Sequence, residues 1–181
     1  MIETTDEEIL SVFREQGTKS KGFTLFMNKY KERIYWHIRR LVVSHEDAQD
    51  ILQETFINVY NNLDGFAGNS KLYTWVYRIA TNECLRLFRN RQKFISSYDA
   101  ISEDLINKLH NIDTEDSDSI LVRFQEAILS LPEKQRLVFN LRYYDELSYE
   151  EISQVLDSSV ATLKTNYHYA SNKIKALMIH A

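Results

Sequence analysis

The chain has 181 residues, of which 44% are hydrophobic, and this length allows one ordinary domain or two small ones with a buried core. Four glycines and one proline argue against a sheet protein, because sheets need turn residues at many corners, and the single cysteine, Cys84, excludes an internal disulfide or a cysteine-based zinc site. No apolar run approaches the roughly 18 residues of a membrane span, and the acidic start at residues 1–8 lacks the order of a signal peptide, so we expect a cytoplasmic protein without membrane insertion.

The formal net charge of -4 argues against nucleic-acid binding, but the charges are sorted into blocks along the chain. Residues 71–93 carry six basic side chains against one acid, and residues 160–181 carry three lysines and no acid. Residues 44–64 carry five acids and no Lys or Arg, and residues 99–118 carry seven acids against one lysine. One such block is typical of a solvated face, whereas four in alternation predict several surfaces with different partners.

Apolar residues recur with helical spacing through most of the chain. In the first half this spacing predicts four helices, over residues 6–15, 23–43, 44–63 and 71–92. Residues 93–118 are rich in Ser, Asp, Glu and Asn, and they predict an acidic flexible linker with room for a short helix near Leu105. As a free coil this linker would span roughly 28 Å on average. We therefore expect an all-α protein of two small helical domains, residues 1–92 and 119–181, joined by the linker.

The third predicted helix has an acidic outer face that includes one apolar side chain. Ala48, Leu52 and Phe56 share its buried side. The outer face carries Asp50, Gln53, Glu54 and Ile57. An isoleucine among acids predicts a protein-binding patch, although a single exposed apolar residue is a weak signal by itself.

The fourth predicted helix combines an aromatic side chain with arginines on one face: Trp75, Arg78, Asn82, Arg86 and Arg89. The segment that leads into it adds polar and aromatic groups at Asn69, Ser70, Lys71 and Tyr73. Arginine attracts phosphate and an aromatic ring stacks on an unpaired base, so this face favours binding of single-stranded or melting DNA. The alternative is a buried Trp75 with solvated arginines, and neither interpretation explains the acid Glu83 on the apolar side of the helix.

The second half of the chain predicts a helix-turn-helix. One helix covers residues 119–130, Pro132 suits the first turn of the next, and Ser148 with Glu151 forms a capping box that opens a short third helix. After a polar turn, the last helix has a buried stripe of Leu163, Tyr167, Ala170, Ile174 and Leu177. The candidates for contacts to DNA are Thr162, Lys164, Thr165 and His168. The alternative is an ordinary amphipathic helix that ends a bundle.

Four segments, in this order, resemble the extracytoplasmic-function sigma factors of the sigma-70 family. Residues 47–56 (DAQDILQETF) resemble the helix with which these factors grip the clamp helices of the polymerase largest subunit. Residues 74–82 (TWVYRIATN) resemble the segment that opens and reads the −10 promoter element. Residues 131–139 (LPEKQRLVF) and 147–152 (LSYEEI) resemble the domain that reads the −35 element.

The resemblance implies a factor that binds core RNA polymerase and directs it to promoter DNA. Residues 1–92 would then bind polymerase through the Asp50–Ile57 face and melt the −10 element through the Trp75–Arg89 face. Residues 119–181 would read the −35 element, and an anti-sigma factor is a further partner that the resemblance allows. The sequence departs from the family at Ala161, where Gly is common, and at Asn166 and Tyr169, where arginine is common. We therefore expect this domain either to bind phosphate more weakly or to prefer a different DNA sequence.

Two other functions are alternatives to a sigma factor. A stand-alone helix-turn-helix regulator would explain residues 131–178 but would leave both faces of the first domain without a role. An enzyme is disfavoured, because the five histidines show no metal-ligand spacing, Cys84 has no evident partner, and no glycine-rich phosphate loop is present. We therefore expect no catalytic residues, no metal and no cofactor.

Overall fold

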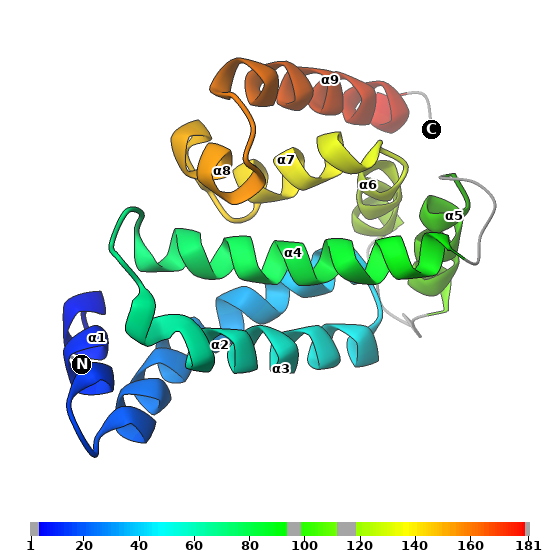
Figure 1. Cartoon of the computed structure of the whole chain (residues 1–181). Helices are drawn as coiled ribbons and strands as arrows, with labels where there is room; N and C mark the ends of the chain where they lie inside the picture. The colour runs from blue at the N-terminus through cyan, green and yellow to red at the C-terminus, as the bar shows by residue number, and fades with distance from the viewer. Residues whose placement is uncertain (1–3, 94–98, 112–118, 180–181) are drawn as a thin grey trace.

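The computed structural model describes residues 4–93, 99–111 and 119–179, and all regular structure within these ranges is helical (Figure 1). The elements are α1 (Asp6–Arg14), α2 (Lys19–Val42), α3 (His45–Asn62), the short 3-10 helix η1 (Leu63–Gly65), α4 (Leu72–Gln92), α5 (Asp99–His110), α6 (Ser119–Leu129), α7 (Glu133–Tyr143), α8 (Tyr149–Leu156) and α9 (Val160–Ile179). In these ranges no helix combines the length and apolarity needed to cross a membrane. The all-α prediction is confirmed; we call α1–α4 the N-terminal domain and α6–α9 the C-terminal domain.

Capping residues explain why several helices begin where they do. Ser44 accepts a hydrogen bond from the backbone N–H of Asp47 at the start of α3. Ser148 accepts from the N–H of Glu151 at 3.2 Å, while the Glu151 carboxylate accepts from the N–H of Ser148 at 2.9 Å, so the predicted capping box at α8 is confirmed. Asp157 ends α8 in the left-handed conformation at φ 50°, which turns the chain towards α9.

The core of the N-terminal domain is aromatic and aliphatic. Phe26 of α2 lies edge-on to Phe56 of α3, with ring centroids 6.0 Å apart, and Val76 of α4 is fully buried in the same apolar cluster. Helix α1 packs closely against the start of α2, where a Cβ atom on Gly22 would lie 2.4 Å from the backbone nitrogen of Phe13. The glycine is therefore needed for the approach of these two helices.

The short helix allowed near Leu105 is present as α5, and its packing against the protein corrects the expectation of a free coil for this part of the linker. Helix α5 buries Ile101 and Leu105, and its Lys108 ammonium lies 3.6 Å from the Asp47 carboxylate of α3. Apolar side chains four residues apart place one stripe against the protein, and this stripe outweighs the acidic composition that favoured a coil. The remainder of the predicted linker, residues 94–98 and 112–118, lies outside the described residues.

The C-terminal domain has a small core of its own beneath the helix-turn-helix. Leu131 and Phe139 pack against Ala170 and Ile174 of α9. The prediction of a buried stripe is therefore confirmed at Ala170 and Ile174 of α9. It is wrong at Leu177, which is 43% exposed near the end of the helix.

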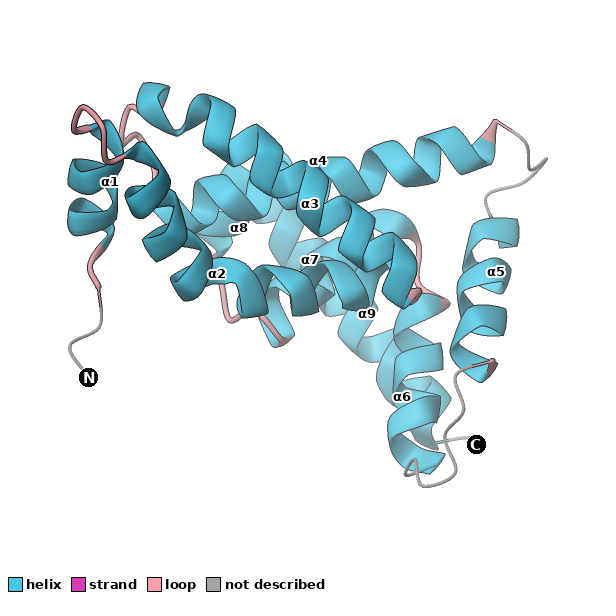
Figure 2. Cartoon of the chain, turned by 90° about the horizontal axis from the view of Figure 1, so that it is seen from below, coloured by secondary structure: helices cyan, strands magenta, loops and turns pink. Residues whose placement is uncertain are grey.

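The two domains are packed against each other. Helix α8 lies on α4, and α7 lies on α2, so the C-terminal domain covers one side of the N-terminal domain (Figures 1 and 2). One apolar cluster continues from Val76 and Phe88 of α4 into Leu141 of α7 and Val155 of α8. The chain thus forms a closed arrangement in which the two domains share buried surface.

Candidate nucleic-acid interface

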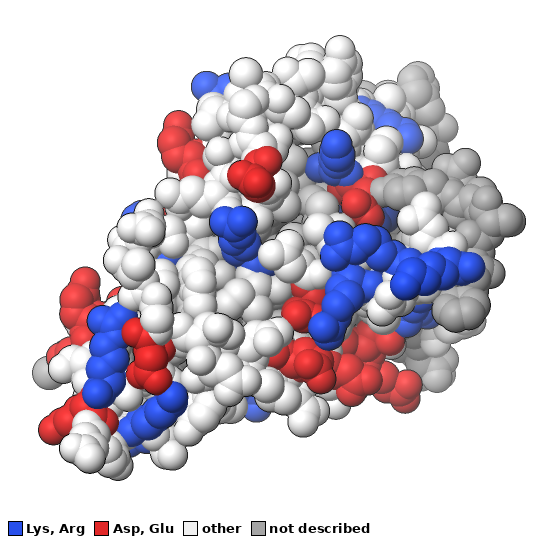
Figure 3. All heavy atoms as spheres, in the orientation of Figure 1, with Lys and Arg blue, Asp and Glu red and all other residues white. Residues whose placement is uncertain are grey.

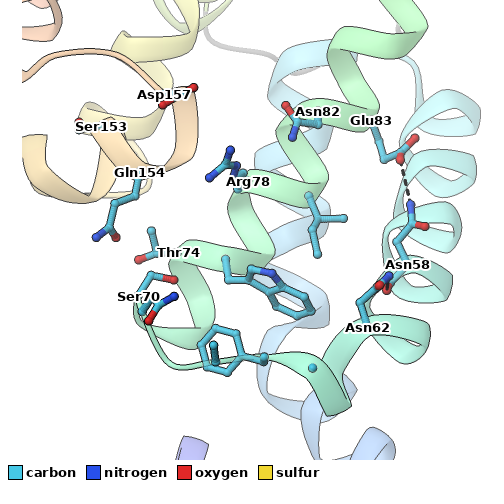
Figure 4. A pocket seen from close by; sticks show the side chains of 16 residues that line it. Asn58, Asn62, Ser70, Thr74, Arg78, Asn82, Glu83, Ser153, Gln154 and Asp157 are labelled. Atoms are coloured by element: carbon cyan, nitrogen blue, oxygen red, sulfur yellow. Dashed lines mark hydrogen bonds between the residues drawn. The ribbon is translucent and has the colours of Figure 1, made fainter.

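A groove of about 940 Å³ with a mixed polar and apolar lining lies between the end of α3, α4 and α8 (Figure 4). Five of the residues predicted to bind the −10 element line it: Asn69, Ser70, Trp75, Arg78 and Asn82. The opposite wall is formed by Ser153, Gln154 and Asp157 of the C-terminal domain. The structure therefore brings most of the predicted surface together, and it places a second domain across from it.

Trp75 is neither a core residue nor a free side chain. It is half-buried, and its indole packs on the Phe66 ring at 5.3 Å with an interplanar angle of 52°. Arg78 and Asn82, one and two turns further along α4, are exposed at the groove. A held aromatic ring next to a guanidinium and an amide can stack on an unpaired base and bind its phosphate and base edges.

Lys71 and Tyr73, at the start of α4, are engaged by the C-terminal domain. The Lys71 ammonium lies 2.9 Å from the Glu151 carboxylate, and the Tyr73 hydroxyl donates a short hydrogen bond to the same oxygen. Burial by itself raises the pKa of the Glu151 carboxyl, but hydrogen bonds from Tyr73, Lys71 and Ser148 outweigh it and hold the pKa at about 2. Glu151 is therefore ionised at neutral pH and neutralises part of the basic surface.

Arg86 and Arg89 lie outside the groove, so the structure divides the predicted arginine face. The Arg86 guanidinium lies 2.6 Å from Glu83 and 3.9 Å from Glu54 of α3. Glu83 also accepts a hydrogen bond from the Asn58 amide at 2.9 Å, and these contacts explain the acid that the sequence left without a role. In Figure 3, Lys and Arg side chains gather over the C-terminal part of α4, with Asp and Glu side chains below them over α3.

The acidic face of α3 is exposed as predicted. This holds for all four of its residues, Asp50, Gln53, Glu54 and Ile57. Ile57 is 47% exposed and borders an apolar groove of about 540 Å³ between α2 and α3. Phe23 and Met27 of α2 line this groove, and sequence reasoning missed them. Phe23 and Met27 are four residues apart, so they lie on one face of α2, and Met27 directly follows the buried Phe26. This spacing could have indicated that they line a groove next to the core.

The four residues predicted to contact DNA from α9 are all exposed but do not share one environment. Lys164 and His168 line an aromatic groove between α7 and α9, where the Lys164 ammonium lies 5.7 Å from the Tyr149 ring centroid. Thr162 and Thr165 lie outside this groove, and the Thr165 hydroxyl donates to the Ala161 carbonyl at 3.1 Å.

Comparison with known proteins gives the same assignment to both halves of the chain. Sigma-70 region 2 matches residues 26–94, and sigma-70 region 4 matches residues 121–174. An ECF RNA polymerase sigma-E factor of Haemophilus influenzae is 30% identical over 98% of this chain and 100% of its own length. The ECF RNA polymerase sigma factor SigW of Bacillus subtilis is 35% identical over 81% of this chain and 83% of its own length.

Solved structures share the fold. The sigma factor RpoE in complex with the anti-sigma factor NepR from Bartonella quintana gives a TM-score of 0.68 at 20% identity, over 87% of this chain and 97% of that one. CnrH in complex with the cytosolic domain of CnrY gives a TM-score of 0.69 at 20% identity, over 95% and 96%. The region 2 match accounts for the N-terminal domain, which a stand-alone helix-turn-helix regulator leaves without a role. The chain therefore belongs to the extracytoplasmic-function sigma factors of the sigma-70 family.

Proposed function

We propose that this protein binds core RNA polymerase in the cytoplasm, directs it to promoter DNA and starts transcription without catalytic activity of its own. The observation that carries this proposal is the order of the matches, with region 2 on α2–α4 and region 4 on α6–α9 of one chain. The two regions supply separate DNA-binding surfaces, and the acidic face of α3 supplies a third surface for a protein partner.

The −10 element is assigned to the start and outer face of α4. Trp75 would stack on an unpaired base, while Arg78 and Asn82 would hold the same strand across the groove. Lys71 and the more distant Arg86 and Arg89 would contribute attraction to phosphate over a longer stretch of the strand. Asn69, Ser70 and Tyr73 complete the assignment as polar contacts at the entrance to the helix.

The −35 element is assigned to α9, and polymerase to α3. Thr162, Thr165 and His168 are exposed and carry donors and acceptors that suit base edges in a major groove, and Lys164 suits phosphate. On α3, the exposed Ile57 beside the apolar groove offers an anchor, with Asp50, Gln53 and Glu54 as its polar surround. An anti-sigma factor is a further proposed partner, because a structural neighbour was solved with one.

A run-off transcription assay with core polymerase and genomic DNA fragments tests this function. We expect discrete transcripts that require the added protein, and we expect fewer of them with the Arg78→Ala, Asn82→Ala double variant. Lys21→Ala, an exposed basic residue at the start of α2, is the control and should transcribe normally. Absence of factor-dependent transcripts, with polymerase bound to the protein, would contradict the proposed function.

A further inference from the structure

The loop that leads from η1 into α4 supports the −10 surface but has almost no core of its own. We call residues 64–70 the connecting loop; Phe66 is half-buried in it, whereas Asp64 and Asn69 are exposed. At Gly68 the backbone φ is 74°, a conformation that glycine adopts without strain. A segment with so few buried side chains is held mainly by contacts from outside it, so those contacts determine where Asn69 lies.

Phe66 links the connecting loop to the aromatic residue of the −10 surface. Its ring packs on the Trp75 indole, with centroids 5.3 Å apart and an interplanar angle of 52°. Because two packed aromatic rings restrict each other's orientation, a displacement of Phe66 would also tilt the indole. The position of the Phe66 backbone therefore sets the plane of the ring to which the proposed function assigns an unpaired base.

Arg14, the last residue of α1, holds the Phe66 backbone in place. Nη2 of its guanidinium donates to the Phe66 carbonyl oxygen at 2.6 Å, across 52 positions of sequence. The Phe66 N–H donates to the Leu63 carbonyl at 3.2 Å, so backbone groups on both sides of this residue have partners. A hydrogen bond from a cation is stronger than one between neutral groups, which makes Arg14 the main outside contact of the loop backbone.

Lys19, at the start of α2, makes a second contact two residues earlier in the loop. Its ammonium lies 2.6 Å from the Asp64 carboxylate, and it also lies 4.9 Å from the Phe13 ring centroid and 5.0 Å from that of Tyr60. An exposed ion pair alone contributes little, but two aromatic rings restrict where this ammonium can lie. We therefore expect Lys19 to hold the loop less firmly than Arg14 does.

Both contacts start from a part of the molecule that cannot shift easily. Phe13 is buried, and its backbone meets α2 at Gly22, where no side chain would fit. The Thr18 hydroxyl donates to the Val12 carbonyl at 2.7 Å and closes the turn between α1 and α2. Arg14 directly follows Phe13, so its backbone is fixed beside η1, against which α1 packs (Figure 1).

We propose that Arg14 and Lys19 are positioning residues for the −10 element, which hold the connecting loop so that Phe66 keeps the Trp75 indole in the plane that stacks on an unpaired base. The part of this proposal that concerns base selection rests on the proposed function of α4. Neither residue lies in the region 2 match, which begins at residue 26, and neither lines the groove beside Trp75. Helix α1 thereby takes part in base selection without an assigned contact to DNA.

This role has a signature that separates it from a general effect of charge. A loop released from Arg14 leaves Arg78 and Lys71 on α4 and at its start, so attraction to the phosphates of a strand is retained. The orientation of the stacking ring is lost, and with it the discrimination between bases. Base preference should therefore fall more than the amount of strand that is bound.

The test uses four variants of the full chain. Arg14→Ala removes the main contact, and Arg14→Lys keeps the charge and one donor and should restore most of the effect. Lys19→Ala removes the second contact and covers the case in which Arg14→Ala fails to fold. Lys21→Ala is the matched control, because this exposed residue of α2 loses the same charge in the same part of the molecule. Folding of each variant is checked by its helical circular dichroism.

The first measurement follows Trp75 directly. The chain has two tryptophans, and the other one, Trp36, is 50% exposed, so Trp36→Phe in every protein leaves Trp75 as the single reporter. We expect acrylamide to quench Trp75 fluorescence roughly 1.5-fold more efficiently in Arg14→Ala, because a released ring meets the quencher more often. Lys19→Ala should show a smaller increase, and Lys21→Ala should show none.

The second measurement gives base preference in the holoenzyme. Core polymerase with each protein is incubated with fork-junction DNA whose single-stranded part has six randomised positions, and the bound strands are sequenced. For Arg14→Ala we expect the preference at the most selective position to fall on the order of fivefold, as for partial loss of one charge-assisted hydrogen bond. The amount of bound strand should fall by less than about twofold, because the phosphate contacts remain.

The outcomes separate the positioning role from the function of α4. Unchanged quenching in folded Arg14→Ala and Lys19→Ala would overturn the hold on the loop, and an equal loss of preference in Lys21→Ala would show that charge alone acts. Increased quenching with an unchanged base preference would overturn the role in base selection. If no holoenzyme, including the one with the unmodified chain, prefers any base, the proposed function of α4 is rejected, while increased quenching would still support the hold of Arg14 on the loop.

Discussion

Ile57 and Asp50 are the residues on which binding to polymerase is most directly testable. Both side chains point outward from α3, and Ile57 lies at the rim of the apolar groove. We expect Asp50→Arg combined with Ile57→Ala to weaken binding to core polymerase by about 2 kcal/mol or more, which is roughly 30-fold, because central contacts dominate an interface. Titration of labelled protein with core polymerase measures this loss.

The control for this experiment is Glu7→Arg, which makes the same charge reversal on the exposed side of α1. Its affinity for polymerase should match that of the unmodified protein. A folded Asp50, Ile57 double variant with unchanged affinity would show that another surface carries the binding.

Cys84 provides a second test at the scale of one residue. The thiol is fully buried within α4, and burial raises its pKa well above the usual range, because the thiolate would lose its hydration. We expect the folded protein to resist iodoacetamide at pH 8 and the urea-unfolded protein to react with one equivalent, as counted by mass spectrometry. Equal rates in both states would mean that the core around Cys84 opens readily.

At the scale of elements, the contact between α1 and α2 depends on the absence of a side chain at Gly22. A methyl group there would overlap the backbone of Phe13, which cannot move without shifting α1. We expect Gly22→Ala to lower the free energy of unfolding by about 1–3 kcal/mol, as measured by urea denaturation. Gly65→Ala, where a Cβ atom meets nothing within 4 Å, is the control. Equal stability of the two variants would contradict the close approach.

Helices were predictable from the sequence wherever a cap and an apolar stripe agreed. Ser148 and Glu151 predicted the start of α8, and the periodicity of α4 predicted both its length and its outer face. The sequence allowed a short helix near Leu105, but the packing of α5 was harder to predict, because the acidic composition obscured a stripe whose burial depends on tertiary contacts. The predicted buried stripe of α9 continues too far, to the exposed Leu177. Helical periodicity shows which side of a helix is apolar, but it does not show where the helices packed against that side end.

The exposed residues of the candidate site were predictable, but their partners were not. Trp75, Arg78 and Asn82 follow from helical spacing within one segment. The Glu151 carboxylate that meets Lys71 is 80 residues away, and Asp145 is 108 residues from His37. Such pairs depend on how two domains dock, and no local pattern in the sequence encodes that arrangement.

For the whole molecule, the shared apolar cluster predicts cooperative unfolding. Leu141 and Val155 of the C-terminal domain are buried in the same cluster as Val76 and Phe88. Loss of either domain would expose apolar surface of the other, so the free chain should unfold as one unit. We expect a single transition in differential scanning calorimetry, with equal calorimetric and van't Hoff enthalpies. Two separate transitions would mean that the domains do not stabilise each other.

Arg136 is buried where α7 meets α4, and this sets a limit on how firmly the closed arrangement is held. Its side chain is 2% exposed, its guanidinium lies 5.5 Å from the Phe88 ring, and burial lowers its pKa. Its guanidinium keeps a hydrogen bond to the Leu129 carbonyl at 3.2 Å within the C-terminal domain, while its Nε has no hydrogen-bond partner among the described residues. A cation with so little hydration is costly, so any water that opening brings to Arg136 favours the open chain and offsets part of the closing energy. Suppose that only the open chain binds polymerase and that about one molecule in 100 is open. The apparent affinity of polymerase for the factor is then about 100-fold lower than its affinity for the open chain. Substitutions at this position would then change how many polymerases are occupied at a given protein concentration, without altering a single contact with the enzyme.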